Sequence, residues 1–138
     1  TIQSRGLGDV YKRQMQHPGF AELVGFEVFP ESDGTGKGQL IVSERHLNPN
    51  GVVHGGALFT LVDTAMGASL MQRLDEGEIC ATLQISMNFL RPVVGGMVEC
   101  EARVVNKGRR LANVRGELYV EDKLVGTADG NFAIMQAP

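Results

Sequence analysis

The chain has 138 residues, of which 43% are hydrophobic and 21% charged, so it can form one folded domain and is not a mostly disordered chain. Its formal charge of −3, with lysines and arginines scattered along the chain, excludes the dense basic patch of a nucleic-acid binder. No apolar run is long enough to span a bilayer, and no signal-peptide-like segment opens the chain, so a cytoplasmic protein without a membrane anchor is expected.

The cysteines and histidines do not form a metal-binding pattern. The two cysteines, Cys80 and Cys100, each lie among alternating apolar residues, and the three histidines are scattered. Neither a zinc site nor a disulfide framework is built from so few separated ligands. We therefore predict two reduced core cysteines and no metal.

The first fourteen residues look foreign to the domain. The segment from Ser4 to Gln14 matches, residue for residue, the in-frame translation of a transposase adapter used in sequencing-library preparation. We predict that residues 1–14 are non-native and disordered, and that the natural domain spans residues 15–138, starting at or near Met15. A polar N-terminal arm is the alternative, and it carries the same expectation of no packing. The source DNA would distinguish the two.

The predicted elements begin with a short helix over residues 17–24, followed by strands over residues 26–30 and 37–44. A turn with the composition Asn48-Pro49-Asn50-Gly51 leads into the only strong long helix, predicted from about Gly55 to Arg73 by its i, i+3, i+4 apolar pattern. Four strands are predicted after this helix, over residues 79–90, 97–106, 111–121 and 124–135.

This order of elements predicts an α+β fold. The short connections favour antiparallel pairing of the strands. A long apolar helix must be covered, and a curved antiparallel sheet wrapped around one central helix covers it most economically.

The start of the long helix is the first candidate site. Gly55 and Gly56 follow His54 there, and a helix N-terminus presents unpaired N–H groups with partial positive charge. Two glycines lower helix propensity, but they leave the backbone open to an oxyanion or a polarised carbonyl. A glycine-rich turn without a ligand remains an alternative interpretation.

Asp63 is the second candidate. It lies within the helix, between Phe59 at i−4 and Met66 at i+3, where an unused carboxylate is costly. A solvated aspartate, or one bonded to a neighbouring strand, is the structural alternative. Gly55 and Asp63 are eight residues apart, about 12 Å along one helix, so they could act on one substrate only from two subunits. A shared function thus implies at least a dimer with antiparallel central helices.

The motif His-x-Asn-Pro-x-Gly-x-x-His-Gly-Gly-x-x-x-x-Leu-x-Asp-x-Ala-x-Gly, over residues 46–67, resembles the hotdog-fold acyl-CoA thioesterases of the PaaI-like, 4-hydroxybenzoyl-CoA thioesterase superfamily. The segments at residues 88–92 and 107–111 are also similar to that family. The resemblance implies a hotdog fold, hydrolysis of an acyl-CoA to a free acid and CoA, and a homodimer that pairs into a homotetramer. CoA would be part of the substrate, and no separate cofactor is implied.

Carried over residue by residue, the resemblance gives Gly55 the role of polarising the thioester carbonyl, with His54 and Asn48 shaping that pocket. Asp63 of the partner subunit would act as general base on water or as nucleophile, and Thr82 would help place the water. The competing interpretations are that His54 only caps the helix, Asn48 is a turn residue and Thr82 is an ordinary strand residue.

Substrate binding is assigned to residues near this motif or at predicted turns, where cationic side chains could meet the CoA phosphates. These are Gly56, Phe59, Asn88, Arg91, Arg109 and Arg110, with Lys107 a further cationic candidate. The apolar candidates for an aryl, arylacetyl or medium-chain acyl pocket are Phe20, Leu23, Phe59, Met66, Leu70 and Phe89. His46 is taken as a surface residue at a strand end and receives no role.

Two other functions stay open. A non-catalytic acyl-CoA-binding or sensing hotdog protein would need the pocket but not Asp63. A hotdog enoyl-CoA hydratase usually pairs an Asp two positions before the Asn with a His shortly after the Pro. Here the first position is His46 and the next histidine is His54, which counts against hydration.

Overall fold

The computed structural model describes residues 19–138, so the segment predicted to be foreign, residues 1–14, lies outside the described residues. The elements follow in the order α2 (Gly19–Val24), β1 (Phe26–Pro30), β2 (Gly36–Ile41), the 3₁₀ turn η1 (Glu44–His46), α3 (Gly55–Met71), β3 (Glu78–Phe89), β4 (Met97–Lys107), β5 (Leu111–Val120) and β6 (Lys123–Gln136).

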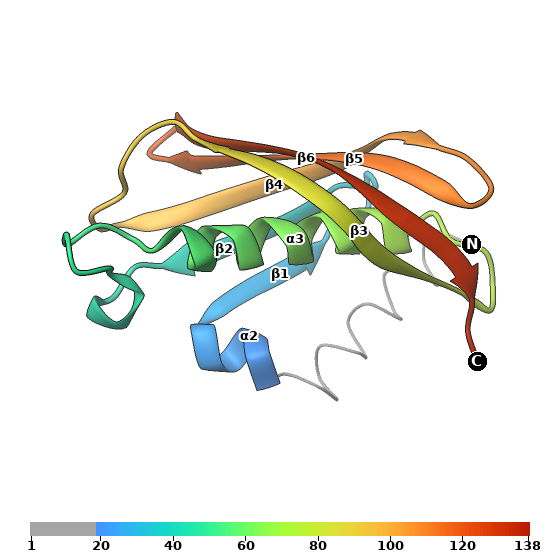
Figure 1. Ribbon diagram of the computed structural model, residues 1–138, viewed down its shortest axis with the longest axis horizontal. Helices are drawn as coiled ribbons and strands as arrows, with labels where there is room; N and C mark the ends of the chain where they lie inside the picture. The colour runs from blue at the N-terminus through green and yellow to red at the C-terminus, as the bar shows by residue number, and fades with distance from the viewer. Residues whose placement is uncertain (1–18) are drawn as a thin grey trace.

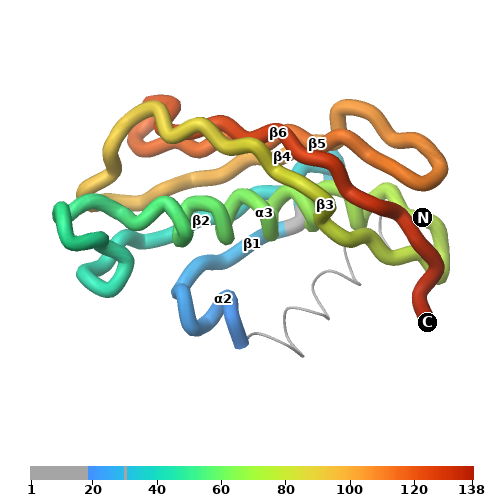
Figure 2. The backbone as a smooth tube through the Cα atoms, in the orientation of Figure 1, coloured from blue at the N-terminus to red at the C-terminus, as the bar shows by residue number. Residues whose placement is uncertain are grey.

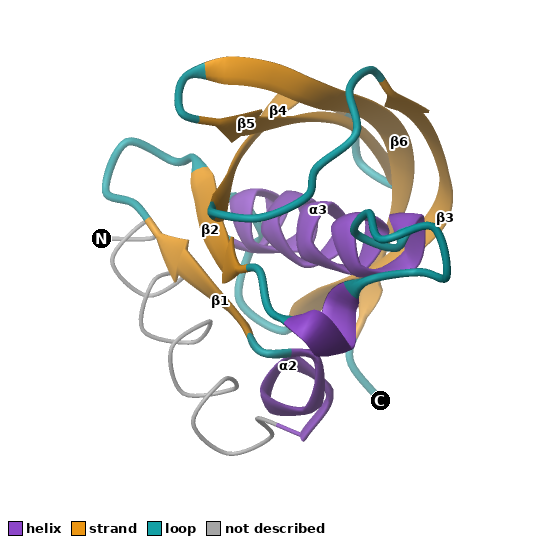
Figure 3. Cartoon of the chain, turned by 90° about the vertical axis from the view of Figure 1, so that its left-hand side faces the viewer, coloured by secondary structure: helices purple, strands orange, loops and turns teal. Residues whose placement is uncertain are grey.

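The strands form one sheet in the order β1-β2-β4-β5-β6-β3, and every neighbouring pair is antiparallel. The sheet arches over α3 in Figure 1. Figure 3 shows it curling around the helix, with α2 lying on the side that the sheet leaves open. The predicted α+β fold, a curved antiparallel sheet around one central helix, is confirmed.

Two predicted boundaries within residues 19–138 differ from the observed ones by two residues or more, for local reasons. β2 ends at Ile41, not at residue 44: the Val42 N–H still bonds to the Gly96 carbonyl in the same register, but the chain then turns into η1 at Glu44. α3 ends at Met71, before the predicted Arg73, whose N–H bonds back to the Leu70 carbonyl at 2.8 Å in a tightened i−3 turn. The helix begins at Gly55, as predicted.

The helix can approach the sheet closely because glycines face it. A Cβ atom added to Gly36 on β2 would overlap the Ala65 carbonyl oxygen of α3, and one added to Gly116 on β5 would overlap Val62. The absent side chains therefore set the depth at which α3 sits in the sheet. The α3 residues buried by this contact are Leu58, Leu61, Val62, Ala65, Met66, Ala68, Ser69 and Leu70.

Cys100 belongs to the same core. It is 3% exposed, and burial, with a smaller contribution from Glu101, raises the pKa of its thiol to about 12. Cys80 is half-buried beside the core. Within residues 19–138, no helix combines the length and apolar character needed to cross a membrane.

β3 forms one edge of the sheet. It pairs with β6 on one side and with no other strand among the described residues. Most of its side chains are exposed, including Leu83 at 59% and Phe89 at 54%. A long edge with exposed apolar side chains can pair with another chain.

Candidate active site

His54 caps the N-terminus of α3. Its backbone is extended, and its Nδ1 accepts a hydrogen bond of 2.8 Å from the Gly56 N–H. Because a backbone N–H can only donate, Nδ1 carries no proton in this arrangement. A Cβ on Gly56 would lie 2.9 Å from Nδ1, so glycine at this position leaves room for the cap.

The Gly55 amide is the open donor of the first helical turn. The Gly56 amide is bonded to His54, and the Ala57 amide bonds to the His54 carbonyl at 3.0 Å. The Gly55 N–H has no acceptor among the residues that the structure describes. The exposed ring of Phe89, at the end of β3, lies beside it, because a Cβ on Gly55 would be 3.0 Å from the ring. The amide can therefore take an external acceptor next to an apolar surface.

Asn48 has a structural use in the preceding loop. Its Oδ1 accepts from the Asn50 amide at 2.9 Å and from the Val52 amide at 3.3 Å. This is the turn geometry that its sequence position before proline indicated. The proposed role in shaping the pocket would have to come from the rest of the half-buried side chain.

Asp63 and Thr82 meet in one protomer. The Thr82 Oγ1 donates to Asp63 Oδ1 at 2.7 Å, linking the middle of α3 to β3. The aspartate is half-buried and the threonine exposed, and no described residue donates to Oδ2. The sequence alternative of an aspartate bonded to a neighbouring strand is therefore present, in a form that leaves the carboxylate accessible.

A bulge in β3 is what turns Thr82 toward the helix. Thr82 lies opposite the buried Phe132, whereas Gln84 lies opposite the exposed Asn131, and Leu83 between them has no register partner on β6. Without the extra residue, alternation would give Thr82 and Gln84 the same face. The insertion therefore creates the Asp63–Thr82 contact.

The cationic candidates lie at two ends of the molecule. The Arg91 amide donates to the Val125 carbonyl, at the end of the molecule where Gly55 and Phe89 lie. The Arg110 carbonyl accepts from Ile134, nine residues further along β6, which is about 30 Å at 3.3 Å per residue. Figure 2 shows the turn between β4 and β5, which follows Lys107 and holds Arg109 and Arg110, at the opposite end from the start of α3. One protomer therefore does not bring them to its own Gly55.

Two further binding candidates, Asn88 and Phe59, lie at the end of the molecule that holds Gly55. Asn88 bonds to Thr127 at 3.4 Å on the face of the sheet opposite its neighbour Phe89. Phe59 is 36% exposed and lies one turn from Gly55.

The predicted pocket lining needs a correction. Met66 and Leu70 have no exposed surface, so they are core residues that touch no ligand. Both lie on the buried face of α3, where Met66 lies against Gly116 and Gly130 of the sheet. Phe20 and Leu23 on α2 are 62% and 70% exposed and stay available to a ligand or a partner chain.

The prediction for His46 was also wrong. It is 5% exposed, one of three buried polar side chains in the described part of the chain. No sequence pattern signals this burial, because the His46 ring contacts Val24, 22 positions earlier in the chain.

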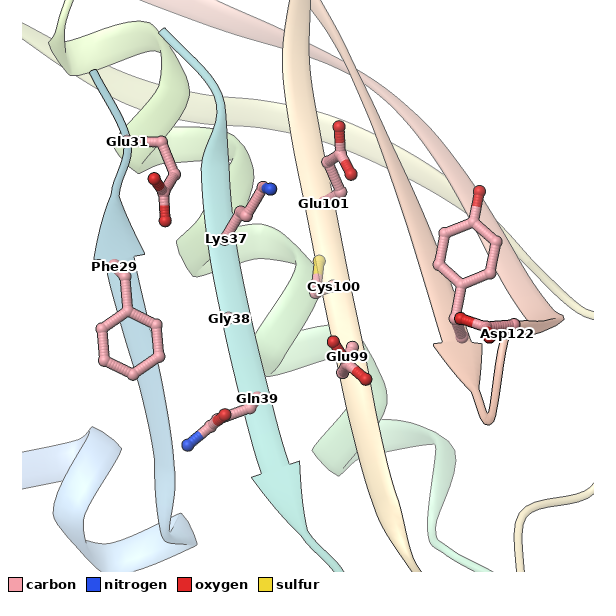
Figure 4. Close-up of a pocket in the computed structure, with 10 residues that line it drawn as sticks. Phe29, Glu31, Lys37, Gly38, Gln39, Glu99, Cys100, Glu101 and Asp122 are labelled. Carbon is pink, nitrogen blue, oxygen red and sulfur yellow. The ribbon is translucent and has the colours of Figure 1, made fainter. Parts of the chain in front are cut away.

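The structure also has a hollow of about 440 Å³ on the outer face of β1, β2 and β4, away from Gly55 and Asp63. Figure 4 shows the side chains of Lys37, Glu99 and Glu101 on the side of the strands that faces away from α3. Charged groups dominate this lining, so the hollow does not suit an acyl chain. They are Glu31, Lys37, Glu99, Glu101 and Asp122.

Comparison with known proteins identifies the family. The sequence profile of the thioesterase superfamily matches residues 50–127, which include the helix start, Asp63 and Thr82. The chain belongs to this superfamily, so it is a hydrolase that acts on thioester bonds.

Individual relatives agree with this assignment. The acyl-CoA thioester hydrolase YciA of Salmonella typhimurium is 33% identical over 94 residues, covering 64% of this chain and 70% of YciA. The thioesterase HI1161 of Haemophilus influenzae has a similar structure, with a TM-score of 0.83, 26% identity and coverage of 90% of this chain and 87% of that one. A mutant of the phenylacetic acid degradation protein PaaI of Thermus thermophilus is 32% identical to this chain, with a TM-score of 0.75. The match covers 83% of this chain and 96% of the PaaI chain.

Proposed function

We propose that the protein hydrolyses an acyl-CoA to the free acid and CoA, with an aryl, arylacetyl or medium-chain acyl group. The observation that carries this proposal is the accessible Asp63 carboxylate, held by Thr82 at 2.7 Å, in a chain whose helix start has an open Gly55 amide. The relative YciA is named an acyl-CoA thioester hydrolase, which supports an acyl-CoA as the substrate class of this protein. CoA is part of the substrate in this proposal, and no separate cofactor takes part.

In the proposed reaction the Gly55 N–H donates to the thioester carbonyl oxygen and stabilises the negative charge that develops there. Water attacks the carbonyl carbon while Asp63 Oδ2 accepts its proton, or the carboxylate itself attacks and water hydrolyses the resulting anhydride. In the first route the carbon–sulfur bond then breaks, and the proton held by Asp63 passes to the CoA sulfur. In the second route the carbon–sulfur bond breaks as the anhydride forms, before water attacks it, and the CoA thiolate takes up a proton from solvent. Thr82 holds the other carboxylate oxygen, Oδ1, and so orients the group.

The two groups belong to different subunits in this proposal. Gly55 and Asp63 are about 12 Å apart on one helix, too far for both to touch one carbonyl. Pairing the free edge of β3 with the β3 edge of a second copy would run the two α3 helices antiparallel on the same side of one continuous sheet. If the helices cross near Phe59, midway between the two residues, each Gly55 faces the partner's Asp63. The exposed ring of Phe59 is consistent with such a crossing.

The dimer is also consistent with the exposed surface of β3. Leu83 and Phe89 are more than half exposed in the protomer, and pairing would cover unbonded edge amides and carbonyls. A pair of such dimers, as the family resemblance implies, is a further part of the proposal.

The first test is thiol release from short, medium, long and aryl acyl-CoAs, with the wild type beside Asp63→Asn. We expect turnover of at least one acyl class by the wild type and nearly complete loss in the variant, which should stay folded and still bind acyl-CoA. Binding without turnover by the wild type would contradict the proposal and favour an acyl-CoA-binding protein. Full turnover by Asp63→Asn would remove Asp63 from the mechanism.

A matched pair of variants tests the role of the Gly55 amide. Gly55 is the first residue of α3, where proline is well tolerated, and His54 has the extended φ of −61° and ψ of 132° that a following proline requires. Gly55→Pro removes the N–H, whereas Gly55→Ala adds a Cβ and keeps it. Loss of one such donor typically costs about 100- to 1000-fold in kcat. Equal kcat values for the two variants would contradict carbonyl polarisation by this amide.

A further inference from the structure

The buried His46 ring is held at both nitrogen atoms. Nδ1 accepts from the Ser43 amide at 3.0 Å, and Nε2 faces the carbonyl oxygen of Val24, the last residue of α2. An amide can only donate and a carbonyl can only accept, so the proton lies on Nε2 and the ring is neutral. This fixes both the tautomer and the orientation of the ring.

A second contact holds the same turn against the end of α2. Gly25, which follows α2 with a φ of 91°, lies under the Arg45 guanidinium, since a Cβ on Gly25 would overlap that group. η1 therefore contacts the junction of α2 and β1 through Arg45 and His46. The end of a helix leaves the Val24 carbonyl without an intrahelical partner, and the His46 ring supplies the missing hydrogen bond.

The backbone of His46 continues this link toward the active site. Its carbonyl accepts from the His54 amide at 2.8 Å, and Leu47 forms a bridge with Val53. The loop from His46 to His54 is thus closed at its base by His46. His54 is the cap of α3 and directly precedes Gly55.

We propose that His46 is a positioning residue for the Gly55 amide, acting through the hydrogen bond from its ring to the Val24 carbonyl. This inference rests on the proposed function, because it assigns the alignment of one catalytic donor to a residue that touches no substrate. The hydrogen bond between the His46 ring and Val24 holds the His46 backbone in place. The His46 carbonyl in turn holds the His54 amide, and His54 sets the direction of the Gly55 N–H. Misalignment of a catalytic group by about 1 Å can cost about 100-fold in rate.

Two variants separate the two ring contacts. His46→Asn keeps an oxygen at the place of Nδ1 for the Ser43 amide but is too short to reach Val24. His46→Gln can extend an amide N–H to Val24 and gives up the local acceptor. We expect His46→Asn to lose about 10- to 100-fold in kcat with little change in KM, and His46→Gln to retain kcat within about threefold. Both are assayed below their melting temperatures, measured by circular dichroism.

A mixing experiment separates positioning from general loss of stability. In hybrid dimers, a subunit with His46→Asn still supplies Asp63, and a subunit with Asp63→Asn still supplies an aligned Gly55. We expect mixing these two variants to restore activity, and mixing His46→Asn with Gly55→Pro to restore none.

Unchanged kcat in folded His46→Asn would overturn the inference, as would an equal loss in the Asn and Gln variants. Restoration of His46→Asn by Gly55→Pro would also overturn it, because the defect would then not lie on the Gly55 side. These outcomes differ from failure of the proposed function, in which the wild type itself would not release thiol from any acyl-CoA.

Discussion

Replacing His54 tests whether the helix cap accounts for this residue. His54→Ala removes the Nδ1 that accepts from the Gly56 amide at 2.8 Å. Loss of an N-cap costs about 0.5–2 kcal/mol, and because Gly56 is exposed, water can satisfy its freed amide, which places the cost at about 0.5–1 kcal/mol. In a domain of this size that lowers the melting temperature by about 2–4 °C.

His54→Asn is the matched control, because asparagine is a preferred cap and its Oδ1 can accept the same amide. Thermal unfolding is followed by circular dichroism at one fixed protomer concentration, since association shifts the midpoint. We expect His54→Asn to melt within about 1 °C of the wild type. A wild-type melting temperature for His54→Ala, or an equal fall for both variants, would refute the capping role. Thiol release by His54→Asn then shows whether the imidazole does more than cap.

Three further predictions concern packing, thiol reactivity and assembly. Gly36→Ala should lower the free energy of unfolding by about 1–3 kcal/mol because its Cβ would overlap the backbone of α3, whereas Gly95→Ala, with nothing within 4 Å of its Cβ, should cost far less. Similar losses for the two variants in denaturant unfolding would contradict the close approach. The Cys100 thiol, with a pKa of about 12, should resist iodoacetamide at about pH 8 until the protein unfolds; rapid native alkylation, located by mass spectrometry, would contradict its burial. Leu83→Glu should convert dimers to monomers in light scattering, while Leu111→Glu in β5, where the side chain is 55% exposed against 59% for Leu83, should not. An unchanged mass for Leu83→Glu would contradict pairing through β3.

The parts of the site that could be predicted depend on local patterns. The helical apolar period and the paired glycines gave the start of α3 at Gly55, and the position of Asp63 on that helix followed from counting residues. Strand alternation and short connections gave the antiparallel sheet. These signals lie within one element, so no distant contact was needed to find them.

The parts that were missed depend on distant contacts. The bulge at Leu83 is a feature of pairing with β6, and only this pairing shows that Thr82 faces Asp63. His46 is buried because its ring reaches Val24 on a separate element. Neither contact leaves a periodic trace in the sequence.

The central claim, that one active site takes Gly55 from one subunit and Asp63 from the other, is tested most directly by mixing two inactive variants. Asp63→Asn and Gly55→Pro each disable every site of their own dimers. A hybrid dimer contains one site with both groups intact, so random exchange in an equal mixture should restore about a quarter of the wild-type thiol release. No restoration, with subunit exchange demonstrated by mass spectrometry, would contradict the shared site.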